Sequence, residues 1–243
     1  EINDLTGIEA FTTLTYLDCS SNSLISLDLS ANTGLEFLEC YENQLTNLDV
    51  SNNTALTLLA CNENQLTSLD VSNNTALTYL NLSGNQLTSL DVSNNTALIT
   101  LYVGGGNQLT SLDVSANTAL AHLAITNNQL TSLDLSNNTA LESFDANACL
   151  LNFNLDLSSN TILTSLFVPN NQFTALDVSA NTALTNIVCR QNQLSSLDLS
   201  SNTALDYLGC RDNDLTSLDV SSNIALTYIN CGSNQLTSLD VSS

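Results

Sequence analysis

The stretch QLTSLDVSNNTAL occupies residues 65–77 and recurs without a change at residues 86–98. Looser copies fill the rest of the 243-residue chain at a spacing of 21 residues, with one extra residue in the fifth copy and one in the seventh. A fixed period of this length is the signature of a repeat architecture. The units open at Leu14, Leu35, Leu56, Leu77, Leu98, Leu120, Leu141, Leu163, Leu184, Leu205 and Leu226. The sequence therefore predicts eleven repeats over residues 14–243, preceded by a partial repeat or cap at residues 1–13.

Each unit contains two short stretches in which apolar and polar residues alternate, such as Leu80-Asn81-Leu82 and Leu90-Asp91-Val92. Alternation with a period of two is typical of strands, and these stretches are too short for helices. Units of this kind bury their leucines only when successive coils stack on one another. We therefore expect a β-rich solenoid, a right-handed coil with a parallel sheet on one face and extended or short-strand segments on the other.

An Asn closes each half of each unit, in one column that begins Asn22, Asn43 and in another that begins Asn32, Asn53. Asn tolerates tight bends, and its side-chain amide can bond to backbone groups that a bend leaves unpaired. The two columns therefore predict two bends in every coil.

The order L-x-x-L-x-L-x-x-N-x-L resembles that of leucine-rich repeats over essentially the whole chain. The 21-residue length, with Cys in a core leucine slot, is similar to a cysteine-containing class found in bacterial surface proteins, the internalins. This resemblance implies a leucine-rich repeat solenoid, an extracellular or cell-surface location and a concave ligand-binding face. The chain lacks an initial Met and ends within the pattern, so we expect a segment of a longer protein. The slot holds Cys19, Cys40, Cys61, Cys189, Cys210 and Cys231, and in the middle units Leu82, Val103, Ile125, Ala146 and Val168.

The seven cysteines invite a disulfide interpretation, but their number is odd and six of them fill this apolar slot. Neighbours in one column would be parallel and about 4.8 Å apart, which suits a disulfide poorly. We expect buried free thiols that act as small hydrophobic side chains. The seventh, Cys149, takes the place of a bend Asn. No C-x-x-C spacing occurs and His122 lies outside the column, so we expect no zinc site.

The charge balance excludes several function classes. The chain has 24 acidic residues, two Arg and no Lys, with a formal net charge of −22. Such a surface repels phosphate, so we expect no nucleic-acid partner, and no apolar run is long enough to suggest a membrane span. With no Lys for a Schiff base, no phosphate loop and no nucleophile beside His122, we expect no enzyme activity.

The outward slots of the first half-repeat vary from unit to unit, whereas those of the second half hardly vary. All six Tyr, both Arg and the single His fall in the three variable columns. Tyr and Arg anchor interfaces, although Tyr also suits any exposed strand. The two Arg either pair with nearby acids or bind an anionic group of a ligand. The candidate ligand-binding residues are Tyr16, Phe37, Tyr41, Leu58, Tyr79, Tyr102, His122, Phe167, Arg190, Tyr207, Arg211 and Tyr228.

We therefore expect an extracellular or cell-surface binding and adhesion module that recognises a protein or a glycan. The alternative is a structural spacer or a subunit that stacks end to end, because a solenoid end exposes strand edges. A weaker alternative is ice or mineral binding, suggested by Thr columns that include Thr46, Thr67 and Thr88.

One Asp recurs in the second half of every unit. Neighbouring carboxylates about 4.8 Å apart would repel by about 0.9 kcal/mol even in bulk water. Either Ser and Thr donate hydrogen bonds to each carboxylate, or adjacent carboxylates share a Ca²⁺ ion, the one cofactor that we consider. The column comprises Asp28, Asp49, Asp70, Asp91, Asp113, Asp134, Asp156, Asp177, Asp198, Asp219 and Asp240.

Overall fold

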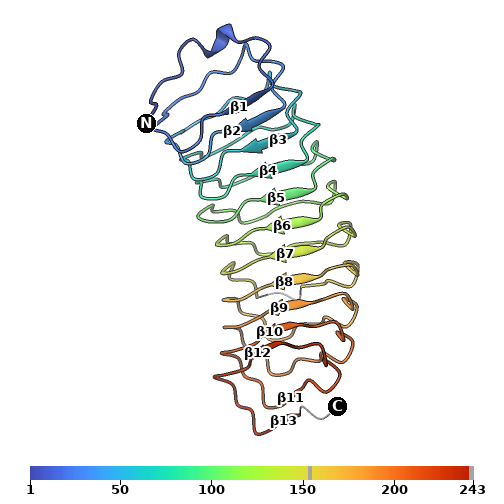
Figure 1. The fold of residues 1–243 in the computed structure, drawn as a ribbon. Helices are drawn as coiled ribbons and strands as arrows, with labels where there is room; N and C mark the ends of the chain where they lie inside the picture. Colours follow the sequence, from blue (N-terminus) through green and yellow to red (C-terminus); the bar gives the residue numbers. More distant parts are fainter. Residues whose placement is uncertain (153–154, 241–243) are drawn as a thin grey trace.

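The computed structural model describes residues 1–152 and 155–240, and it is a single stack of coils that runs from the N-terminus at one end to the C-terminus at the other (Figure 1). Each coil contributes one three-residue strand to an 11-stranded parallel sheet, in which neighbours follow chain order. The register never slips: Leu17 pairs with Leu38, and Leu208 pairs with Ile229. The expected parallel sheet is confirmed. Its strands are β1 (Tyr16–Asp18), β2 (Phe37–Glu39), β3 (Leu58–Ala60), β4 (Tyr79–Asn81), β5 (Thr100–Tyr102), β6 (His122–Ala124), β7 (Ser143–Asp145), β8 (Ser165–Phe167), β9 (Asn186–Val188), β10 (Tyr207–Gly209) and β12 (Tyr228–Asn230).

The second half of each coil is extended. Within the described residues it forms a sheet only near the C-terminal end, where β11 (Leu218–Asp219) pairs in parallel with β13 (Leu239–Asp240). At the other end, residues 1–13 contain a short 3-10 helix, η1 (Ile8–Ala10). The Asn32 amide donates to the carbonyl oxygens of Ile8 and Phe11. Later coils use the same two bonds, so this segment lies where the second half of a coil would lie.

The core is a continuous column of leucines between the two halves, with residues such as Leu38, Leu59 and Leu80 completely buried. The slot that holds Cys is part of this core. All seven cysteines are free, and only Cys231 is partly exposed, because its coil belongs to the last strand of the sheet and is covered on one side. Burial raises the pKa of the Cys61 thiol to about 12, so the reactive thiolate is strongly disfavoured there. The expected buried free thiols are therefore confirmed for six of the seven.

The two Asn columns form hydrogen-bonded ladders between coils. In the first, Asn43 Nδ2 donates to the carbonyl oxygens of Cys19 at 3.0 Å and Cys40 at 3.1 Å, and its Oδ1 accepts the Leu24 N–H at 2.9 Å. In the second, Asn53 Nδ2 donates to the carbonyl oxygens of Leu29 at 3.1 Å and Asn32 at 2.9 Å. The predicted role of Asn at both bends is confirmed.

Candidate ligand-binding face

The strand geometry places the variable slots on one surface. In β2 to β10 the middle residue of each strand is buried, so the residues on either side of it point away from the core. A third outward slot follows each strand. We call the surface formed by these three columns the variable face. Five of its slots differ from expectation because they are buried: Ala60, Thr100, Gly104, Pro169 and Gly209. Thr100 lies in register between Tyr79 and His122, whose larger side chains cover it.

Aromatic rings meet in pairs along the variable face. The Tyr16 and Phe37 centroids are 6.2 Å apart with tilted rings. Tyr79 meets Tyr102 edge to face, with centroids 5.9 Å apart. These geometries are favourable for aromatic pairs.

An acidic hollow of about 310 Å³ lies near the N-terminal end of the variable face, and we call it the N-terminal hollow. The Tyr16 hydroxyl donates to Glu39 Oε1 at 3.0 Å, and this bond raises the pKa of Tyr16. The Ser21 hydroxyl donates to Glu42 Oε2 at 2.8 Å. The two carboxylates of the hollow, those of Glu39 and Glu42, therefore already accept hydrogen bonds within the protein. The hollow is lined by Glu39, Tyr41, Glu42, Leu58, Ala60, Asn62, Tyr79 and Asn81.

A second hollow, of about 330 Å³, lies near the other end of the face, and we call it the C-terminal hollow. The Tyr207 and Tyr228 rings are stacked beside it, with centroids 4.3 Å apart and planes 5° from parallel. Burial raises the pKa of Asp145, although its carboxylate accepts the Asn147 N–H at 3.0 Å. The hollow is lined by Asp145, Asn147, Phe167, Pro169, Val188, Arg190, Tyr207, Gly209, Arg211, Tyr228 and Asn230.

The two arginines of this hollow differ in their partners. Arg211 Nε lies 3.2 Å from Asp212 Oδ2, which is the one ion pair within the described residues. Arg190, one coil earlier in the same column, has no such partner among the described residues. The pKa of Tyr207 is raised, first by burial and then by the neighbouring Tyr228, and the positive charge of Arg190 opposes this rise. The pairing hypothesis therefore holds for Arg211 and fails for Arg190.

The remaining candidates divide by position. Phe167 lines the C-terminal hollow, whereas Tyr102 and His122 line neither hollow. Sequence reasoning missed eleven lining residues. Ten of them stand in the variable columns, so membership of the columns was the signal that could have identified them, whereas Glu42 lies at the bend outside those columns. The ten are Glu39, Ala60, Asn62, Asn81, Asp145, Asn147, Pro169, Val188, Gly209 and Asn230.

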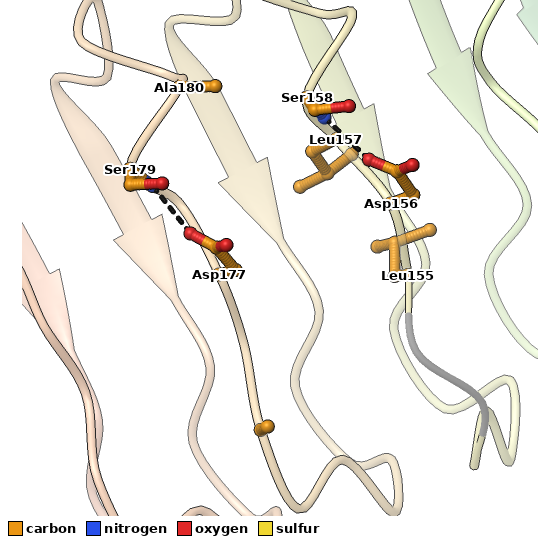
Figure 2. A pocket seen from close by; sticks show the side chains of 8 residues that line it. Leu155, Asp156, Leu157, Ser158, Asp177, Ser179 and Ala180 are labelled. Atoms are coloured by element: carbon orange, nitrogen blue, oxygen red, sulfur yellow. Dashed lines mark hydrogen bonds between the residues drawn. The ribbon is translucent and has the colours of Figure 1, made fainter.

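The second halves of the coils form the opposite surface, which we call the repeated face. The carboxylate of each described column Asp from 28 to 219 accepts the backbone N–H of the Ser two residues later, at 2.9 Å. Figure 2 shows two such bonds, from Ser158 to Asp156 and from Ser179 to Asp177. Each of these carboxylates therefore has a backbone N–H as a hydrogen-bond donor, as the first of the two explanations expects. The Asp240 side chain lies outside the described residues.

A groove of about 380 Å³ separates Asp156 from Asp177 on the repeated face (Figure 2). Grooves of about 260 Å³ and 150 Å³ lie beside Asp198 and Asp28 in other coils. Because the groove recurs with the repeat, it follows from the coil geometry and does not mark a unique site. Within the described residues no three His, Cys, Asp or Glu side chains gather in a group able to hold a metal. A shared Ca²⁺ therefore stays a prediction.

Comparisons with known proteins agree with this geometry. Residues 75–122 match the family model of leucine-rich repeats in two copies. The functional domain of internalin J (InlJ) from Listeria monocytogenes, described as including a cysteine ladder, superposes on 98% of the chain with a TM-score of 0.95 and 43% identity. The chain spans 53% of that InlJ chain. Among curated proteins no relative matches.

Two more distant structures share the fold alone. The internalin InlF of Listeria monocytogenes has a TM-score of 0.80 and 23% identity, over 99% of this chain and 80% of its own. The ectodomain of the Arabidopsis thaliana receptor kinase GASSHO1/SCHENGEN3 has a TM-score of 0.71 and 18% identity, over 98% of this chain and 34% of its own.

The stacked coils, the Asn ladders and the variable face together define a leucine-rich repeat solenoid, an architecture that serves as an interaction scaffold. The chain therefore has the leucine-rich repeat fold, and its cysteine-containing repeats are similar to those of internalin J. Its described residues include no helix of the length and apolar character that crossing a membrane requires.

Proposed function

We propose that this chain is an extracellular or cell-surface binding module that holds a protein partner on its variable face. The supporting observation is the asymmetry between the two faces. The variable face carries every Tyr and Arg of the chain and two hollows, whereas the repeated face presents the same Asp and Ser from coil to coil.

The distance between the hollows fits a protein interface. β3 and β9 contribute to the N-terminal and C-terminal hollows respectively, and six strand spacings of about 4.8 Å separate them by about 30 Å. A partner that reaches both hollows would cover a surface of the size found in specific protein complexes, about 800 Å² on each side.

The ring geometry favours a protein over a glycan. A sugar stacks on an open ring face, but the stacked Tyr207 and Tyr228 rings cover one face of each other. The edges and hydroxyl groups of these rings, with the one face that each ring keeps free, suit side-chain packing and hydrogen bonds.

We place the protein among binding modules and not among enzymes. Both hollows are open on a regular sheet, so neither excludes water completely. Electrostatic catalysis depends on a site from which water is excluded. End-to-end stacking and ice or mineral binding stay alternatives, which light scattering and a thermal-hysteresis assay respectively would test.

The test compares the two faces of the same coils on arrays of cell-surface proteins and of glycans. Tyr207→Ser with Tyr228→Ser removes the stacked pair, and Ser already occupies this column at 143 and 165. The control, Ser196→Ala with Ser217→Ala, changes the repeated face, where Ala175 already occupies the column.

We expect wild-type protein to bind saturably to a protein on the array. The tyrosine variant should lose at least about tenfold in affinity, equivalent to about 1.4 kcal/mol, while the control variant binds as wild type does. Equal binding by the two variants would reject the variable face as the site. Binding to glycans alone would support the glycan alternative.

A further inference from the structure

Arg190 is a cation that the protein leaves without an ionic partner. The chain holds 24 acidic residues against two Arg, yet within the described residues no carboxylate lies within 4.0 Å of the Arg190 side chain. Arg211 follows it in the next coil and is paired with Asp212. With so many acids available, folding alone does not require an exposed and unpaired arginine at this position.

The walls around Arg190 suit a charged group of a ligand. Phe167, Pro169 and Tyr207 contribute apolar surface to the same hollow, and such surface lowers the local dielectric and strengthens a charge-assisted bond. The raised pKa of Asp145 has burial as its first cause, which indicates that the hollow is partly shielded from water.

Anions differ in how they would meet this site. A guanidinium fork matches a carboxylate with two parallel hydrogen bonds. The net charge of −22 repels a polyanion such as nucleic acid or a sulfated glycan. A single carboxylate among neutral neighbours carries one charge, so it is repelled far less. The hollow of about 330 Å³ is at the lower end of the range of ligand pockets, so it fits one or two side chains of a partner.

We propose that the C-terminal hollow binds one Glu or Asp side chain of a protein partner, with Arg190 as its counter-ion and with Phe167, Pro169 and the Tyr207–Tyr228 pair holding the apolar residues beside it. This inference rests on the proposed function of the variable face. The inference adds that the C-terminal end of that face selects an acidic side chain.

The probe is an array of short peptides in which a single central Glu is flanked by apolar and neutral residues, each paired with the same peptide carrying Gln. We expect wild-type protein to prefer the Glu peptides by about tenfold. Arg190→Gln should remove this preference. Arg211→Gln is the matched control, because that charge is already paired with Asp212, and it should keep most of the preference.

Three results would overturn the proposal: equal binding of Glu and Gln peptides, no binding of any peptide by wild-type protein, or a preference that survives Arg190→Gln. Arg190→Gln should leave the melting temperature unchanged, since no described hydrogen bond or ion pair involves the Arg190 side chain. Binding could be lost in the double variant Tyr207→Ser and Tyr228→Ser and yet be equal for Glu and Gln peptides. This result would reject the present inference but would still support the proposed function.

Discussion

The Cys149 thiol donates to the carbonyl oxygen of Ile125 at 3.0 Å, in the place where the neighbouring coils use an Asn amide. One coil earlier, Asn128 makes the full set of bonds: Nδ2 donates to the Val103 and Ile125 carbonyl oxygens, and Oδ1 accepts the Leu109 N–H, each at 2.9 Å. A thiol offers a weak donor and a weak acceptor, so the hydrogen bonds between the sixth and seventh coils are weaker at this position than those between other coils.

Replacing Cys149 by Asn should therefore stabilise the protein. The new amide would strengthen the donor bond and add an acceptor for the backbone of the preceding coil, for a gain of about 1 kcal/mol. The reverse change, Asn128→Cys, should cost about 1–3 kcal/mol, because buried groups lose their partners. Chemical denaturation measures both. A Cys149→Asn variant no more stable than wild type would show that the ladder tolerates the thiol without cost.

In the second Asn ladder, a buried Asn and the exposed Asn before it should differ in how much their replacement destabilises the protein. Asn95 Nδ2 donates to the buried carbonyl oxygens of Val71 at 3.0 Å and Asn74 at 2.9 Å. Asn95→Ala should cost about 1–3 kcal/mol, since two buried hydrogen bonds between coils are lost while each acceptor keeps one backbone donor. The exposed neighbour Asn94 is the control, and Asn94→Ala should cost less than about 0.5 kcal/mol. Similar unfolding free energies for the two variants would contradict the role given to this ladder.

The Asp column allows the hydrogen bond to be separated from the charge. In Asp70→Asn the side-chain oxygen can still accept the Ser72 N–H, while the repulsion from neighbouring coils disappears. Asp70→Ala loses the acceptor as well. At neutral pH we expect the melting temperature of Asp70→Asn to equal or exceed that of wild type, and that of Asp70→Ala to fall. If both variants melted lower by the same amount, the charge itself would be required.

Acid should increase the stability of Asp70→Asn relative to wild type. Hydrogen bonds from the side chain and backbone of Ser72 lower the pKa of Asp70, so its contribution to stability is present above the unfolded pKa of about 3.9. That contribution is lost as the pH falls through the lower folded pKa. Asp70→Asn lacks this titration, so it should gain on wild type as the pH is lowered from about 5 to about 2. Thermal melts across this range measure the difference.

Added salt tests whether screening or bound Ca²⁺ reduces the repulsion between the carboxylates of the repeated face. Raising NaCl screens the repulsion between exposed carboxylates, so the melting temperature should rise. If neighbouring Asp side chains share Ca²⁺, CaCl₂ should raise it further at equal ionic strength, and EDTA should reverse that extra rise. A melting temperature that none of the three additions changes would reject both the screening and the Ca²⁺ hypotheses.

The sequence predicted the features that each coil repeats for itself. The 21-residue period, the Asn bends and the Cys slot are local patterns, and each appears in the structure where it was expected. The sequence also indicated the columns that supply the hollows, but it did not give the packing of side chains between coils. Thr100 is buried because Tyr79 and His122 lie on either side of it. The C-terminal hollow joins side chains from strands β7 to β12, and no single unit contains that information.

The most direct test of the account asks which face of one coil touches a partner. Tyr207 lies on the variable face and Ser217 lies on the repeated face of the same coil. A photo-crosslinking residue at each position, in separate variants bound to a partner found on the protein array, reports contact directly. The account predicts cross-links from position 207 and none above background from position 217. Cross-links from 217 alone, or equally from both positions, would contradict it.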